Sequence, residues 1–578
     1  MILIIYLLYF LLSFDFIPLL LFDTNRFIVL FVYISFIFLF FIAVKFLKKY
    51  ENLFFNYNKY KNNRELLFLK SVIFFIILFI FITILRIAWF GDDAYIAFRV
   101  VDNFVNGYGL RWNVEERVQT YTSPLWLFLN SFIYFFYRDI YVVALVNSFI
   151  FSFLSIWIVY KLSKSYNTAI VVLLILLFSK PFIEYCTSGL ENPLLYFLFS
   201  IFLFFYFKND FSQKNLIILT LISSLIIITR QDNILLIIPP IFYFVYKTGI
   251  KKSIFPIFIG SIPFIAWELF SLIYYGFPFP NTYYAKVFHK VPQIKILEKG
   301  VNYYFDIMIR SPETFLIIII CIIITILEYT KNKKNIFITA GIILYFIYIL
   351  KIGGDFMTGR FFSTVLLISA CIVSQYELEK NKIQWLVLMI FILCIGIFGK
   401  NFSPLYTTED FFYLINENEK GIADERGYYY PVTSLVCKLK DKRKIKLYDA
   451  DFWIADGIEN REKSKNGRLV VKSGPMGLYG FYSGPKVYII DDFALTDPFL
   501  SRLPSHPASR IGHFARELPE GYFESVKQNK NLLKDKNLAE FYDKILLITR
   551  GPIFSKERFK TIIKMNLGLY DYLLPKKF

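Results

Sequence analysis

Residues 71–93 read SVIFFIILFIFITILRIAWFGDD, a mostly apolar run that ends at Gly91 and two aspartates. A helix needs about 20 mostly apolar residues to cross a bilayer, so residues 71–90 are predicted to span a membrane. Ionisable side chains at the end of a span are candidates for function. One of Asp92 and Asp93 could act as a general base on a hydroxyl group, or the pair could hold a divalent cation. The alternative is a polar helix cap that faces water.

Apolar runs of the same character fill the first 400 residues. They lie at 1–22, 27–46, 71–90, 141–161, 168–181, 192–207, 215–230, 233–247, 253–275, 312–330, 335–351, 361–375 and 384–399. Hydrophobic residues make up 56% of the 578 residues, charged residues 19%, and the mean hydropathy is +0.51. This composition excludes a disordered chain, a collagen-like chain and an ordinary cytosolic enzyme. The predicted fold class is an α-helical polytopic membrane protein with about 11–13 transmembrane helices.

Lys and Arg concentrate in one set of loops, at 45–70, 161–165, 247–253 and 331–334. Cytoplasmic loops of membrane proteins carry such an excess, which accounts for the net charge of +19 without a nucleic-acid partner. We therefore expect a multi-pass protein with a cytoplasmic N-terminus. The first apolar run lacks a basic n-region and an A-x-A site, so we expect it to be retained as a span.

The other set of loops would then face outward. It comprises 91–140, 182–191, 230–233, 276–311, 353–360 and everything after 400. The segments with distinctive polar, aromatic or glycine-rich sequence all fall in this set, whereas the basic loops are Lys/Asn/Ser stretches. A functional site on the outer face is therefore predicted.

The segment GGDFMTGR at 353–360 is the second strong candidate after the aspartate pair. Its three glycines permit backbone conformations that other residues resist. Asp355 and Arg360 on such a turn suit an anionic, hydroxylated ligand, although a tight interhelical turn with an ion pair would look the same. Lys286, in PNTYYAK, could neutralise a phosphate as a point charge or could be an interfacial lysine.

The remaining candidates in the outward loops have weaker signals. Arg99 suits bidentate phosphate recognition, with a solvated charge as the alternative. The segment YTSPLW, from Tyr121 to Trp126, could stack on a ligand or anchor a short helix at the membrane interface. Possible cavity-lining or acceptor-binding residues are Glu191, Arg230, Asp232 and His513.

A metal centre of the usual His/Cys kind is not expected. The five Cys form no CxxC pair, and no two of the three His residues sit at helical metal spacing. Neither a disulfide framework nor a zinc site is therefore predicted.

The composition changes after residue 400, where apolar runs shorten to the length of strands. KIKLYD, RLVVKS and KVYIIDD are predicted strands, while GPMGLYGFYSG, FESVKQNKNLL and the region 537–545 are predicted to open or form helices. Alternating strands and helices indicate an extracytoplasmic α/β domain at 401–578. The charged triplet Asp424, Glu425 and Arg426 precedes three tyrosines in this region.

Taken in order, these segments resemble a known family. The segments are GDDAYIAFR, NGYGLRWN, ERVQTYTSPLW, TSGLENPL, TRQDN, YYGFPFPNTYYAK, GGDFMTGRFF, DERGYYY, DDFALTDPFLSRLP and IGHFARELPEGY. They are similar to the integral-membrane arabinofuranosyltransferases that add terminal residues to mycobacterial arabinan, a family also described as flagellar motor control proteins and part of the GT-C class. The resemblance covers about 71–525, so residues 1–70 hold two extra spans and a basic loop, and 71–400 a GT-C-like catalytic region.

The resemblance implies an inverting glycosyltransferase of the bacterial inner membrane. Its donor would be a polyprenyl-phosphate sugar, its acceptor an envelope or surface glycan, and no cofactor is certain. Asp92 and Asp93 would be the catalytic carboxylates, and replacing either with Asn should abolish turnover. Arg99, Lys286, Asp355 and Arg360 would bind donor phosphate or sugar.

Two other functions fit the same sequence. A non-enzymatic membrane protein that affects the flagellar motor would keep its activity without the aspartates. A transporter of lipid-linked sugar would need polar residues within its spans and paired broken helices, whereas few charges lie within the spans of this chain.

Overall fold

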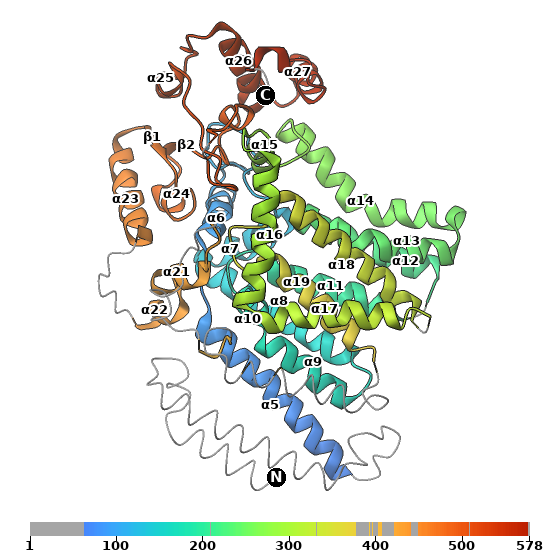
Figure 1. The fold of residues 1–578 in the computed structure, drawn as a ribbon. Helices are drawn as coiled ribbons and strands as arrows, with labels where there is room; N and C mark the ends of the chain where they lie inside the picture. The colour runs from blue at the N-terminus through green and yellow to red at the C-terminus, as the bar shows by residue number, and fades with distance from the viewer. Residues whose placement is uncertain are drawn as a thin grey trace.

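The computed structural model describes residues 63–208, 210–330, 332–376, 392, 396, 403–406, 421–440, 449–507 and 509–575. The predicted spans 1–22 and 27–46, nearly all of 384–399, and residues 444–448 of the predicted strand KIKLYD lie outside the described residues. The described chain is mostly helical. The C-terminal region, which we call the cap, lies with residues 522–566 over the upper end of a long helical bundle and with residues 425–440 and 449–483 along one side of it (Figure 1).

Four of the described helices are long and apolar enough to cross a membrane. They are α5 (Asn63–Ile87, apolar from Leu66), α8 (Ile140–Leu162), α14 (Ile250–Tyr274) and α18 (Lys333–Ile352). A fifth span would be the pair α16 (Gln293–Arg310) and α17 (Pro312–Leu327), which bend by 109° at their junction. Shorter apolar helices are α7 (Pro124–Phe136), α9 (Tyr166–Phe178), α11 (Asn192–Phe207), α12 (Gln213–Thr229) and α19 (Arg360–Val373). The helical fold is confirmed, and the count of 11–13 spans stays a prediction.

Several helix boundaries follow from the local sequence. Asp139 and Ser165 cap α8 and α9 by accepting hydrogen bonds from backbone N–H groups of the first turn. Gly353 ends α18 in the left-handed region, and Gly354 and Gly359 also have positive φ values. The prediction that the 353–360 turn depends on its glycines is confirmed.

The segment 276–311 was expected to be an outer loop, but it contains helix α15 (Asn281–Val287) and the 18-residue helix α16. In α16, Ile296, Tyr303 and Ile307 are buried, whereas Phe305 and Ile309 are exposed. Charged residues interrupt this pattern in the sequence, so no uninterrupted apolar run reveals the helix.

The C-terminal region contains a small βαβ unit. Strand β1 (Leu469–Ser473) and strand β2 (Val487–Asp491) pair in parallel, with Leu469 opposite Val487, and helix α24 (Leu478–Ser483) connects them. The predicted strands RLVVKS and KVYIIDD and the helix opened by GPMGLYGFYSG are confirmed. Within the described residues the sheet has two strands. The other helices are α21 (Glu425–Thr433), α22 (Leu435–Lys440), α23 (Asp449–Lys463), α25 (Tyr522–Gln528), α26 (Lys536–Arg550) and α27 (Lys556–Asn566).

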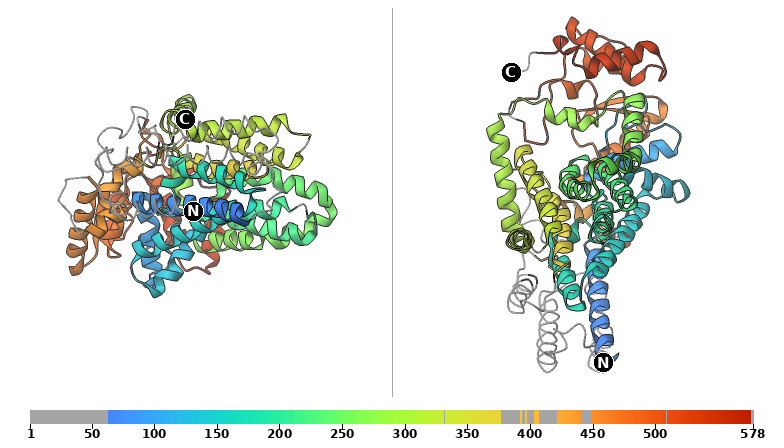
Figure 2. Two further views of the ribbon diagram at one scale, coloured as in Figure 1. Left: turned by 90° about the horizontal axis from the view of Figure 1, so that it is seen from below. Right: turned by 90° about the vertical axis from the view of Figure 1, so that its right-hand side faces the viewer.

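The C-terminal region packs directly on the outer-loop segments of the bundle. Buried Leu478 and Ile489 belong to the same apolar core as the helices of the bundle. A second core joins Phe277 and Ala285, from the segment around α15, to residues of α25 and α26. The cap therefore shares both cores with the segments it packs on, and its helices α25, α26 and α27 lie at the end of the molecule opposite the start of α5 (Figures 1 and 2).

Candidate active site

The two adjacent aspartates have different surroundings. Both lie in the first turn of α6 (Asp92–Val105). The carboxylate of Asp92 accepts hydrogen bonds from the backbone N–H groups of Gly477, at 3.1 Å, and Leu478, at 2.7 Å. A Cβ atom at Gly477 would lie 1.9 Å from the Asp92 carbonyl oxygen, so only glycine permits this approach. Asp92 therefore joins α6 to the start of α24.

Asp93 is half-buried and, among the described residues, it forms no hydrogen bond or ion pair. Burial raises the pKa of Asp93, Arg360 and Lys286 lower it, and Asp355 and Glu191 raise it again, with a net rise. Burial also raises the pKa of Asp92 to about 6, against the two amide hydrogen bonds that stabilise its charge. A carboxylate with a raised pKa and no hydrogen-bond partner is suited to accept a proton. Both aspartates have a raised pKa, but only Asp93 lacks such a partner among the described residues, so the base role fits Asp93 better than Asp92.

A chain of ion pairs brings together three of the predicted outer loops. Arg360 lies 3.1 Å from Glu191 and 3.5 Å from Asp355. Arg230 lies 3.0 Å from the same Glu191 oxygen and 2.9 Å from Asp232. The loops 182–191, 230–233 and 353–360 therefore meet at one place. We call the group Asp93, Glu191, Arg230, Asp232, Lys286, Asp355 and Arg360 the charged cluster.

Only one of the two carboxylate oxygens of Asp355 accepts a hydrogen bond from the described residues. Its Oδ1 accepts a hydrogen bond from the N–H of Phe356 at 2.8 Å, whereas its buried Oδ2 accepts none. Burial raises the pKa of Asp355, but Arg360, Lys286 and Arg230 outweigh that effect, and the pKa is lowered. Buried polar atoms are rarely left without a hydrogen bond, so Oδ2 is a candidate acceptor for a ligand hydroxyl.

Lys286 belongs to the charged cluster through its electrostatic action, and His513 lies next to the turn that carries Asp355. The exposed side chain of Lys286, on α15, forms no hydrogen bond or ion pair within the described residues, yet it acts electrostatically on Asp93 and Asp355. The His513 ring packs edge-on against Phe356, with 4.6 Å between centroids. Burial and the cations near it lower the pKa of His513 to about 3, so its imidazole is neutral at physiological pH.

Arg99 was predicted to bind the donor, and the structure corrects this prediction. Its guanidinium donates hydrogen bonds to the carbonyl oxygens of Trp112 at 2.9 Å, Gly480 at 2.5 Å and Val487 at 2.8 Å. It also lies 4.2 Å from the centroid of the Trp112 ring. The side chain of Arg99 is buried, and its N–H groups donate to backbone carbonyl oxygens. Arg99 therefore links α6 to the βαβ unit.

Replacing Arg99 with Lys is expected to lower the free energy of unfolding by about 1–3 kcal/mol, because an ammonium cannot reproduce the three-way fork and leaves buried carbonyls without donors. If the chain uses the donor that the resemblance implies, the KM for that donor should not change. Thermal unfolding in detergent and a donor titration measure the two quantities. A raised donor KM with unchanged stability would restore Arg99 to the binding site.

The aromatic candidates also have structural partners. The hydroxyl of Tyr121 lies 2.7 Å from the hydroxyl of Tyr275. The indole N–H of Trp126 donates to the Gly189 carbonyl at 2.9 Å, and the N–H of Gly91 donates to the Ser188 carbonyl at 3.0 Å. Trp126 therefore ties the loop that ends at Glu191 to α7, and Gly91 ties the same loop to the start of α6. Neither aromatic side chain is among the groups that act on the charged cluster.

Glu425 was not predicted as a site residue, although the charged triplet 424–426 was noticed. It lies at the start of α21, is 9% exposed, and interacts electrostatically with Asp93, Asp92 and Asp355. The sequence could not indicate this position, because it depends on pairing between segments more than 60 residues apart in the chain.

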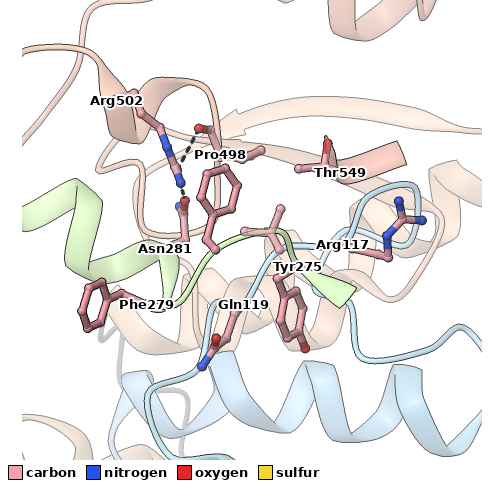
Figure 3. Close-up of a pocket in the computed structure, with 10 residues that line it drawn as sticks. Arg117, Gln119, Tyr275, Phe279, Asn281, Pro498, Arg502 and Thr549 are labelled. Atoms are coloured by element: carbon pink, nitrogen blue, oxygen red, sulfur yellow. Dashed lines mark hydrogen bonds between the residues drawn. The ribbon is translucent and has the colours of Figure 1, made fainter. Parts of the chain in front are cut away.

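A small pocket lies in the seam between the bundle and the cap (Figure 3). Its lining includes Tyr275, Asn281 and Arg502. Arg502 donates to the side-chain oxygen of Asn281 at 2.6 Å and to the Pro498 carbonyl at 3.0 Å. The pocket contains no member of the charged cluster, and its two arginines, Arg117 and Arg502, are both engaged by protein groups, so we assign it no chemistry.

The predicted divalent cation at the aspartate pair remains a prediction. Both oxygens of Asp92 accept backbone hydrogen bonds, which leaves Asp93 as the open carboxylate of the pair. Over the described part of the chain, no three His, Cys, Asp or Glu side chains are grouped as metal ligands.

Comparison with known proteins gives a distant similarity. No family model matches the chain. The terminal beta-(1->2)-arabinofuranosyltransferase of Corynebacterium glutamicum is 23% identical over 445 residues, which cover 67% of this chain and 61% of that protein. The chain therefore spans less than two thirds of its relative. The distant similarity supports the role of a glycosyltransferase, and the apolar helices support a place in a membrane.

Proposed function

We propose that the chain is an inverting glycosyltransferase of the GT-C class. It would move a sugar, an arabinofuranose-like pentose or another, from a polyprenyl-phosphate donor to an envelope or surface glycan at the outer face of the bacterial inner membrane. The observation that carries the proposal is an open carboxylate, Asp93, beside two cationic groups, Lys286 and Arg360. A base and a phosphate-binding charge are the two requirements of this reaction.

The proposed reaction is one displacement. Asp93 accepts the proton of the acceptor hydroxyl, and that oxygen forms a bond to the anomeric carbon. The bond from the anomeric carbon to the phosphate oxygen breaks, and the lipid phosphate leaves with the electron pair. Because attack and departure occur on opposite faces, the anomeric configuration inverts. Lys286 and Arg360 would stabilise the negative charge that grows on the phosphate.

The acids of the cluster have separate proposed roles. Glu191 is 2% exposed and engaged by Arg360 and Arg230, so it would orient those guanidinium groups and not act as a base. The Asp355 oxygen without a hydrogen bond would accept one from a sugar hydroxyl. Placement at the end of apolar helices suits a donor whose lipid chain stays in the bilayer.

Replacing Lys286 with Ala is expected to raise the KM for the donor by about tenfold or more, because the exposed ammonium would bind the donor phosphate and has no structural partner to lose. Stability should stay unchanged. Lys295→Ala, which removes an exposed lysine from α16, is the matched control. Equal donor KM values for both variants would contradict the assignment of Lys286.

The proposed function is tested with the purified protein in lipid vesicles. The assay supplies a radiolabelled polyprenyl-phosphate arabinofuranose, an arabinan oligosaccharide acceptor and, in parallel, a panel of other polyprenyl-phosphate sugars. We expect transfer from at least one lipid-linked donor and none from a nucleotide sugar. Absence of transfer from every lipid-linked donor, with a folded protein, would overturn the proposal.

A further inference from the structure

A segment of the chain beyond residue 420 is pinned against the glycine-rich turn of the charged cluster. Ala423 pairs with Met357 in an isolated parallel β-bridge. The N–H of Ala423 donates to the Phe356 carbonyl at 2.7 Å, and the N–H of Thr358 donates to the Ala423 carbonyl at 3.0 Å. The first residues of α21 therefore have a fixed position next to Asp355.

Buried ion pairs hold both neighbours of Glu425. Asp424 lies 2.6 Å from the ammonium of Lys180, and Arg426 lies 3.0 Å from Glu184. Both partners belong to α10 (Lys180–Glu184), and all four side chains are at most 3% exposed. Asp424 also accepts a hydrogen bond from the N–H of Gly427 at 2.9 Å. The backbone that carries Glu425 is thus fixed on both sides.

Glu425, unlike Asp424 and Arg426, forms no ion pair with the described residues. It is 9% exposed, and among the described residues it accepts no hydrogen bond and forms no ion pair. The charged groups that act electrostatically on it are Asp92 and Asp93 from α6, Asp355 from the turn and Arg510 from the loop after β2. Glu425 is therefore a buried carboxyl that lacks a hydrogen-bond or ion-pair partner among the described residues, and it acts electrostatically with the acids of the site.

We propose that Glu425 is a second carboxyl of the active site, which keeps its proton in the working state and shares it with Asp93. This inference rests on the proposed function. Two neighbouring carboxyls cannot both ionise cheaply, so one retains a proton. Arg360 and Lys286 stabilise the charge of Asp93, whereas three of the four groups that act on Glu425 are acids. The proton therefore stays on Glu425.

The shared proton limits the charge of the site. With Glu425 neutral, its O–H group donates a hydrogen bond to Asp93 or to the acceptor oxygen, and the pair carries one negative charge next to an anionic donor. If Glu425 ionises, the pair carries two charges and repels the phosphate. Activity should therefore fall at low pH, when Asp93 gains a proton, and fall again at high pH, when Glu425 loses its own.

The test is the pH profile of transfer for wild type, Glu425→Gln and Glu115→Gln. Gln imitates a protonated Glu but cannot ionise. We expect Glu425→Gln to keep turnover within about tenfold of wild type, to keep the acid limb, and to shift the alkaline limb upward by about one pH unit or more. The control removes a partly exposed carboxylate that pairs with Arg468, and it should keep both limbs.

The contrary outcomes are distinct. An unchanged alkaline limb in Glu425→Gln, with both limbs merely scaled, would show a structural role only and overturn the inference. An acid limb moved to lower pH would show that Glu425 is charged in the working state, which also overturns it. If wild type transfers no sugar at any pH, the proposed function fails, and the inference fails with it.

Discussion

Asp93→Asn is expected to reduce the rate of sugar transfer by about 10²–10⁴-fold, because the amide cannot accept the proton of the acceptor hydroxyl. Fold and stability should be preserved, since Asp93 makes no hydrogen bond or ion pair with other described residues. The measurement is turnover at saturating donor, with thermal unfolding of the same preparation. Wild-type turnover in this variant would remove Asp93 from the chemistry.

Asp92→Asn is the matched control. One oxygen of the amide still accepts a hydrogen bond from Gly477 or Leu478, but the other interaction is lost, so we expect a lower unfolding temperature and a smaller loss of turnover than for Asp93→Asn. From the sequence alone we expected both variants to be inactive. An inactive but stable Asp92→Asn, with an active Asp93→Asn, would exchange the two roles.

The second large effect is on stability. Lys180→Met is expected to lower the free energy of unfolding by about 3–5 kcal/mol, because removing one member of a buried ion-pair network leaves another charge uncompensated. Lys180 contacts Asp424 at 2.6 Å and Glu184 at 3.8 Å, and each side chain is 3% exposed. The loss should appear in thermal unfolding of the detergent-solubilised protein.

Lys164→Met provides the comparison for this variant. Its exposed side chain forms no ion pair with the described residues, so its stability should match wild type. If Lys180→Met is as stable as Lys164→Met, the buried network does not hold α21 in place. The fixed position of Glu425 would then lose its structural basis.

Much of the bundle could be predicted from apolar runs, because burial in lipid leaves few alternatives to a helix. Every predicted run that falls within the described residues is helical, from α5 to α19. The helix α16 was missed because charged residues interrupt its apolar residues, so the sequence shows no continuous apolar run there. Four shorter apolar runs also gave helices below the length of an ordinary span.

The sequence predicted which loops form the site better than it predicted the role of each residue in them. Loop charge alone grouped Glu191, Asp355 and Arg360, and the structure brings them into contact. Arg99 was misread because its partners, the carbonyls of Gly480 and Val487, lie nearly 400 positions away in the sequence. The difference between the two adjacent aspartates has the same origin, since it depends on where the start of α24 lies.

Glycan linkage analysis of envelope and flagellar material from a deletion strain tests the central claim most directly. The strain is complemented with wild type or with Asp93→Asn. The account predicts a terminal sugar that is missing from the deletion strain, restored by wild type and still missing with the variant. Unchanged glycans in the deletion strain, with any motility phenotype rescued equally by both proteins, would contradict it and favour a non-enzymatic role.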